Sequence, residues 1–175
     1  MRTLLKTGWY VLYVRSRQEN TVGKRLKEKG LESFVPMIET LRKWSDRKKI
    51  ISVPLFSSYV FVRINNNRDL HDAMSVEGAC SFITCGKEYS LATDQEIEQI
   101  KFLINSKDVQ NIQTDNRRLL VGEMRMIEKG SLSGLECEII NINNENKIIV
   151  RLSSINQSIT ATLPSYYLSK IPSAV

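Results

Sequence analysis

The sequence has little of what most enzymes and membrane proteins require. Its 175 residues include a single histidine, His71, and contain no nucleophile elbow, no phosphate-cradling glycine loop and no paired metal-ligand spacing. No apolar stretch approaches the roughly 18 residues of a membrane helix, and the apolar run at the start, MRTLLKTGWY, is too short for a signal peptide. We therefore expect a cytoplasmic protein that is not an enzyme, needs no cofactor and contacts no membrane.

Cysteine is also scarce. Cys80, Cys85 and Cys137 make an odd number, and none of them belongs to a CxxC pair. A zinc site built from these three thiols and His71 stays open, although the spacing differs from that of the common zinc sites. Buried, reduced thiols are the favoured interpretation, so we expect no metal.

Positive charge is unevenly distributed along the chain. The net charge is +6, but residues 1–50 carry thirteen Lys/Arg against five Asp/Glu, and the remaining residues carry twelve against fourteen. A phosphate backbone attracts such a concentration of cations through counterion release. Nucleic-acid contact and a merely solvated hairpin tip are both compatible with the pattern. The densest part, which we call the cationic cluster, surrounds Trp44 and comprises Arg42, Lys43, Arg47, Lys48 and Lys49.

Hydrophobic periodicity predicts strands and a helix in the first third of the chain. WYVLYVR at 9–15 is apolar on both alternating faces, which is typical of a central strand. Ser16 and Glu19 have the spacing of a capping box, and Gly30 is placed to end the helix that they begin. Two extended arms, FVPMIETLRKW and RKKIISVPLF, then lead to the strand SYVFVRI.

The rest of the chain divides into a helical part and a β-rich part. A short helix at 69–75, a strand at 80–84 and an amphipathic helix capped by Thr93 and Glu96 complete a predicted domain over residues 1–106. Its predicted fold is α+β, an antiparallel sheet with flanking helices. Residues 107–118 lack an apolar period and are predicted to be a linker. Residues 119–175, with a short end strand at Tyr167 to Ile171, predict a small SH3-like barrel of five strands.

The segment VPLFSSYVFVRI, residues 53–64, is unusually rich in aromatic side chains. In a strand, Tyr59, Phe61 and Arg63 share one face, and valine and isoleucine occupy the other. Alternation does not reveal which face the protein itself covers. The aromatic side chains are therefore either part of the core or a surface for a partner.

Four segments in this order resemble the NusG family of transcription elongation factors: WYVLYVRSRQE, FVPMIETLRK, PLFSSYVFV and VGEMRMIEKGSLSGLE. The resemblance covers essentially the whole chain and implies an N-terminal NGN domain followed by a C-terminal KOW domain. The first and third segments are similar to the specialised, operon-specific branch to which RfaH belongs, and to UpxY-type regulators of capsular polysaccharide.

The resemblance implies a docking face for the clamp helices of bacterial RNA polymerase. By motif position this face comprises Phe56, Tyr59 and Phe61, with Trp9 and Phe82 in support. The alternative is that these aromatic residues are buried and have only a structural role. The sequence favours that role for Trp9, leaves both roles open for Phe56, and favours the docking interface for Tyr59 and Phe61.

The resemblance also implies that a domain bound there lies beside the non-template DNA strand of the transcription bubble. The resemblance implies that Arg15, Arg17, Gln18 and Arg25 are candidates for reading bases, because arginine and glutamine can pair with base edges. A solvated helix face is the alternative for Arg25. The cationic cluster is expected to attract nucleic acid without regard to sequence.

For the KOW domain the resemblance implies a partner-binding loop around Gly130, Leu132 and Gly134, with a small-subunit ribosomal protein or the termination factor Rho as partner. The asparagines and β-branched residues of this half favour strands, so we expect no helical alternative fold. The implied function is an operon-specific antiterminator, acting as a monomer on operons such as those for polysaccharide biosynthesis. A ribosome-associated KOW-type RNA-binding protein is the alternative.

Overall fold

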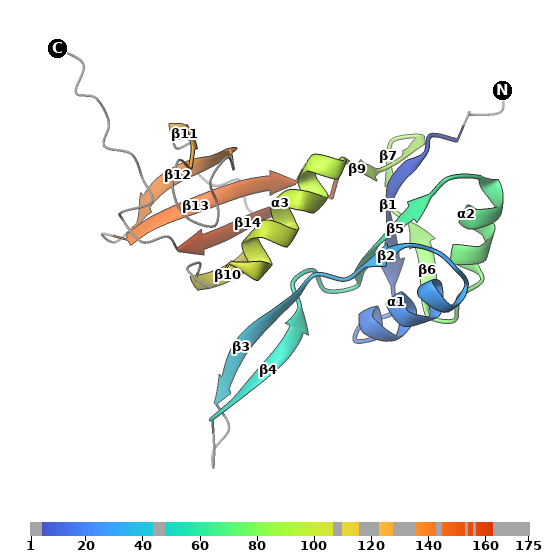
Figure 1. Ribbon diagram of the computed structural model, residues 1–175, viewed down its shortest axis with the longest axis horizontal. Coiled ribbons are helices and arrows are strands. Elements are labelled where there is room, and N and C mark those ends of the chain that lie inside the picture. Colours follow the sequence, from blue (N-terminus) through green and yellow to red (C-terminus); the bar gives the residue numbers. More distant parts are fainter. Residues whose placement is uncertain are drawn as a thin grey trace. The chain divides into compact units, whose positions relative to one another are not determined.

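The computed structural model describes residues 5–43, 48–106, 110–115, 123–127, 136–142, 145–152, 154–155 and 157–162. The chain folds into two compact units, Met1–Ile97 and Glu98–Val175, and each is described by itself. The described residues combine antiparallel sheets with three helices (Figure 1), in agreement with the predicted α+β class.

The N-terminal unit is built on a five-stranded antiparallel sheet. Its central strand is β1 (Gly8–Val14), the segment whose two apolar faces predicted this position. β1 pairs with β5 (Tyr59–Ile64) on one side and with β6 (Ala79–Phe82) on the other. β2 (Ser33–Phe34) extends the sheet beyond β5, and β9 (Leu91–Ala92) also pairs with β1.

Two helices, α1 (Glu19–Glu28) and α2 (Asn67–Met74), cover one face of this sheet. Burial of apolar side chains from both layers makes this the core of the unit, because each large side chain that leaves water contributes about 1.5–3 kcal/mol. The buried residues of this core are Tyr10, Leu12, Val14, Val22, Leu26, Leu31, Val60, Val62, Ile64, Ala73, Val76 and Phe82.

The predicted capping box at the start of α1 is wrong. The helix begins at Glu19, its N-cap Gln18 makes no side-chain cap bond, and the Glu19 carboxylate instead accepts the backbone N–H of Ser58. The end of the helix agrees with prediction, because Gly30 adopts φ +80°, a conformation that glycine adopts without steric cost.

The other two helices begin with side-chain caps. Asn66 Oδ1 accepts the N–H of Asp69 at the start of α2. At the start of α3 (Asp94–Asn105), Thr93 Oγ1 accepts the N–H of Glu96, whose carboxylate accepts the N–H of Thr93 in return. This reciprocal pair confirms the capping box predicted for that helix.

Two short hairpins also belong to the N-terminal unit. β3 (Met37–Lys43) and β4 (Lys48–Pro54) form a two-stranded ribbon that projects from the sheet (Figure 1). β7 (Thr84–Cys85) pairs with β8 (Glu88–Tyr89), so the strand predicted at 80–84 is divided between β6 and β7.

The C-terminal unit contains a five-stranded antiparallel sheet in the order β10-β14-β13-β12-β11. One strand, β10, lies inside segment 107–118, the segment that the sequence predicts to be a linker. Its sequence QNIQTD lacks an apolar period, and it pairs with β14 at the edge of the described sheet. The predicted end strand at 167–171 lies outside the described residues. The five strands are β10 (Gln110–Asp115), β11 (Glu123–Met126), β12 (Glu136–Ile142), β13 (Glu145–Leu152) and β14 (Gln157–Thr162).

Across the described ranges, no helix is long and apolar enough to cross a membrane.

A candidate docking surface on the N-terminal sheet

The aromatic face is the face of the sheet opposite the core that α1 and α2 cover. It is defined by the register of β1 and β5, in which Trp9 pairs with Arg63, Val11 with Phe61, and Tyr13 with Tyr59. Residues directly opposite each other on neighbouring strands project from the same face. The side chains of these three pairs therefore lie on one surface.

The middle of the aromatic face is buried. Phe61 is 0% exposed, and its ring centroid lies 5.9 Å from that of Phe56 and 6.2 Å from that of Phe34. The expectation that Phe61 forms an open surface is therefore wrong, because rings of the same unit pack against it. Phe56 and Trp9 are also buried, which favours a structural role for both.

Phe82 does not belong to the aromatic face. It pairs with Leu12, which projects toward the helices, and it is part of the core beneath them. Its ring makes an edge contact with the ring of Tyr10, at 5.7 Å between centroids. The prediction that Phe82 supports a docking face is therefore wrong, because β-sheet register puts it on the other side.

The open end of the aromatic face is a pair of tyrosines. Tyr13 is 42% exposed, Tyr59 is half-buried, and their rings meet edge to face at 5.9 Å. We call them the tyrosine pair. Tyr13 was not among the predicted site residues. Alternation along WYVLYV places it on the same face as Trp9, but only the pairing of β1 with β5 reveals that it lies opposite Tyr59.

The turn before β5 is held by contacts with the start of α1 and the end of β1. Ser58 adopts φ +66°, which is unusual for a residue with a side chain. Its N–H donates to Glu19 Oε1 at 2.7 Å, and its carbonyl accepts the N–H of Val14 at 2.9 Å. The carboxylate of Glu19 is itself buried, so this bond is shielded from water. Tyr59 follows directly, and the turn therefore fixes where its ring emerges.

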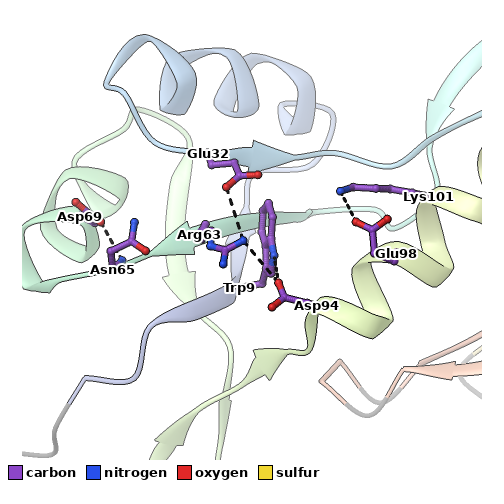
Figure 2. A network of polar contacts seen from close by, with 8 residues as sticks. All are labelled: Trp9, Glu32, Arg63, Asn65, Asp69, Asp94, Glu98 and Lys101. Carbon is purple, nitrogen blue, oxygen red and sulfur yellow. Dashed lines mark hydrogen bonds and ion pairs between the residues drawn. The ribbon is translucent and has the colours of Figure 1, made fainter.

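The opposite end of the face is closed by polar contacts, which Figure 2 shows around Trp9. The Trp9 indole N–H donates to Asp94 Oδ1 at 3.0 Å, and the Arg63 guanidinium lies 5.8 Å from the ring centroid of Trp9. Arg63 also makes ion pairs with Asp94 at 3.6 Å and with Glu32 at 4.0 Å. These contacts tie the first residue of α3 to the sheet and leave the tyrosine pair as the accessible end.

The candidate base-reading residues lie near the end of β1 and the start of α1, but they are not equivalent. Arg15 and Arg17 are exposed, and Arg17 adopts φ +66°. Gln18 is half-buried. Arg25 makes an ion pair with the Glu77 carboxylate at 2.9 Å and donates to the Glu77 carbonyl. Its guanidinium thus holds α1 against the loop after α2, which favours a structural role for Arg25.

Four residues of the cationic cluster belong to the β3–β4 ribbon. Lys48 and Lys49 are exposed, and Arg42 and Lys43 occupy the register positions opposite them. Arg47 lies outside the described residues, as do Gly130, Leu132 and Gly134 of the predicted partner-binding loop.

In the part of the chain that the structure describes, no group of three or more His, Cys, Asp or Glu residues is placed to hold a metal ion. Cys80 and Cys85 are exposed, so the expectation of buried thiols is wrong for these two, which lie on β6 and the β7–β8 hairpin. Cys137 is buried in the C-terminal unit, and this burial raises the pKa of its thiol to about 11.

Comparison with known proteins identifies the family of the N-terminal unit. Residues 7–101, more than half of the chain, match NusG, described as transcription termination factor nusG. The chain belongs to the NusG family. The matched residues include the tyrosine pair, the buried aromatic rings Phe34, Phe56 and Phe61, and the β3–β4 ribbon.

Comparison with solved structures finds a similar fold in one NusG structure. A structure of NusG from Thermotoga maritima is 22% identical and covers 93% of this chain and 96% of that chain, with a TM-score of 0.52. A chain of the MjSpt4:Spt5 complex is 12% identical over 93% of this chain and 97% of that chain, with a TM-score of 0.33.

Proposed function

We propose that this protein is an operon-specific transcription elongation factor that binds the clamp of bacterial RNA polymerase and reduces pausing and termination. The family match supports a role in transcription. The observation that carries the proposal is the tyrosine pair, because it leaves two aromatic rings accessible at the end of an otherwise buried face.

The chemistry of the tyrosine pair suits a protein partner. Tyrosine offers large apolar area at low conformational-entropy cost, keeps a hydroxyl for a hydrogen bond, and is enriched among the residues that dominate binding energy. Phe61 belongs to the neighbouring register pair on the same face and is buried against Phe56. In this proposal the helices of the clamp lie across Tyr13 and Tyr59, and the buried rings make no direct contact.

The nucleic acid in this proposal is the non-template strand of the transcription bubble. Arg15 and Arg17 are exposed just beyond Tyr13 on the chain, and Gln18 follows them. Arginine and glutamine side chains bind base edges as well as phosphates, which is the chemistry that recognition of a short sequence element in selected operons requires.

Antitermination in this proposal is a binding effect and involves no covalent step. A factor that binds the elongating polymerase more tightly than the paused polymerase shifts the population toward elongation, and the shift is limited by that difference in affinity. The C-terminal unit, in the same proposal, is a KOW domain that recruits a small-subunit ribosomal protein or Rho, and the target operons include those for polysaccharide synthesis.

Transcription by purified bacterial RNA polymerase through a pause site and a terminator tests the function. We expect the wild-type protein to shorten the pause and raise readthrough, and Tyr13→Ala and Tyr59→Ala to lose this effect. Tyr89→Ala is the matched control, because Tyr89 is also an exposed tyrosine, at 43%, but contacts Tyr10 and Phe82 on the other face. Readthrough that is the same with and without the wild-type protein, on templates from the protein's own genome, would contradict the function.

A further inference from the structure

The loop between α2 and β6, residues 75–78, is tied to α1 by polar contacts at two places. The Arg25 guanidinium bonds to both the carboxylate and the carbonyl of Glu77, each at 2.9 Å. One turn further along the helix, Lys29 Nζ donates to Ser75 Oγ at 3.0 Å. Each contact is on the surface and is weak alone, but together they fix both the position and the orientation of this α2–β6 loop.

Gly78, the last residue of the α2–β6 loop, meets the chain where β1 leads into α1. Its φ is +98°, a conformation that glycine adopts without steric cost. Its carbonyl accepts the N–H of Arg15 at 2.9 Å, and the Arg15 carbonyl accepts the N–H of Gln18 at 3.1 Å. Gly78 is therefore bonded to the segment 15–18, which carries three of the candidate base-reading side chains.

The missing side chain of Gly78 leaves room for the side chain of Gln18. A Cβ at Gly78 would lie 2.9 Å from Val22 Cγ2 and would collide with Gln18 Oε1. Gln18 is half-buried, so part of its surface stays open to a ligand. The Gln18 carboxamide thus lies directly over the backbone of Gly78, and this contact limits the positions that the carboxamide can take.

We propose that Gly78 is a positioning residue for sequence recognition, because it holds the Gln18 carboxamide in place for one base of the non-template strand. The assignment deepens the proposed function, on which it rests for the contact between Gln18 and DNA. A carboxamide can donate to and accept from one base edge together only in a suitable orientation. A side chain that is already held in that orientation also loses less conformational entropy on binding.

The test uses elongation complexes of purified bacterial RNA polymerase in which the non-template strand is randomised within the bubble. The strands that the full-length protein retains are sequenced, which gives the base preference at each position. Gln18→Ala identifies the position that Gln18 reads, because the preference is lost there. We expect Gly78→Ala to lower the preference at that same position about fivefold or more and to leave the other positions unchanged, since a bidentate side-chain contact discriminates between bases by at least about this factor.

Gly30→Ala is the matched control. Gly30 also has a positive φ, +80°, but a Cβ there would come within 4 Å of no described residue other than its neighbours in the chain. This variant adds the same methyl group at a similarly strained backbone position, so it should keep the whole preference profile. Gln18→Ala combined with Gly78→Ala should have the profile of Gln18→Ala alone, because Gly78 acts only through Gln18.

Glu77→Ala is a second variant that adds no atoms to the interior. It removes one of the ties between the loop and α1, and it should lower the preference at the same position by a smaller factor. An unchanged preference in Gly78→Ala, or in Glu77→Ala if Gly78→Ala does not fold, would overturn the proposal, as would a loss spread evenly over all positions. A wild-type protein without any base preference would contradict the proposed function as well, which distinguishes the two failures.

The Kd of each variant for core RNA polymerase without DNA should equal that of the wild type, because the change is confined to the contact with DNA.

Discussion

Truncation of Phe61 should destabilise the N-terminal unit far more than truncation of its neighbour on the aromatic face. Phe61 is fully buried, and its ring contacts those of Phe34 and Phe56. Replacing a buried phenylalanine with alanine costs about 3–5 kcal/mol, and an edge-to-face ring pair, such as Phe61 with Phe56, contributes about 0.5–1.5 kcal/mol beyond burial. We therefore expect Phe61→Ala to lower the free energy of unfolding by an amount in the upper part of that range. Tyr59→Ala, at a half-buried position, should cost about 1–2 kcal/mol.

Urea unfolding followed by tryptophan fluorescence measures the free energy of unfolding of the wild type and of both variants. The two tryptophans, Trp9 and Trp44, belong to the N-terminal unit, so the signal reports on that unit and not on the C-terminal one. Phe61→Leu is a useful intermediate, because leucine keeps much of the buried apolar area and should lose less stability than alanine. A loss below about 1 kcal/mol for Phe61→Ala would contradict the burial of this ring, since removing a buried phenylalanine ring typically costs about 3–5 kcal/mol.

Two further predictions concern a buried carboxylate and the thiols. Glu19→Ala should lower the free energy of unfolding by about 2 kcal/mol, because it leaves the N–H of Ser58 without its buried acceptor. Glu19→Gln should cost less, because its amide oxygen still accepts this hydrogen bond. A change of less than about 0.5 kcal/mol for the alanine variant in the same urea assay would refute the prediction. Burial raises the pKa of the Cys137 thiol from 9.0 to about 11, so its contribution to stability is complete below pH 9 and is lost as pH rises from about 9 toward 11. Accordingly, a thiol reagent at neutral pH should modify Cys80 and Cys85 in the native protein and Cys137 only after denaturation, and three rapidly reacting thiols would contradict the structure.

Local sequence patterns predicted those elements whose causes are local. WYVLYV and YVFVRI are strands as their apolar residues indicate, and Thr93 with Glu96 caps α3 as their spacing indicates. Ser16 and Glu19 have the same spacing, but Glu19 bonds to Ser58, 39 residues away. No local pattern encodes such a contact, because it depends on how the turn before β5 meets the start of α1.

Strand alternation identified the residues that share a face but not what covers it. This is why Phe61, on a strand correctly predicted, was expected to be open and is buried. Phe82 was placed on the wrong face because the register of β6 against β1 is set by tertiary pairing. The sequence of β10 has no apolar period, so only its backbone pairing with β14 reveals this strand.

The affinity of the full-length protein for bacterial core RNA polymerase tests the central claim most directly. Titration of the labelled protein with the polymerase gives the Kd for the wild type, Tyr13→Ala, Tyr59→Ala and the matched control Tyr89→Ala. If the tyrosine pair is the docking surface, each of the first two variants should raise the Kd about tenfold or more, while the control stays within about twofold. Wild-type affinity in both tyrosine-pair variants, in proteins that unfold as the wild type does, would contradict the claim.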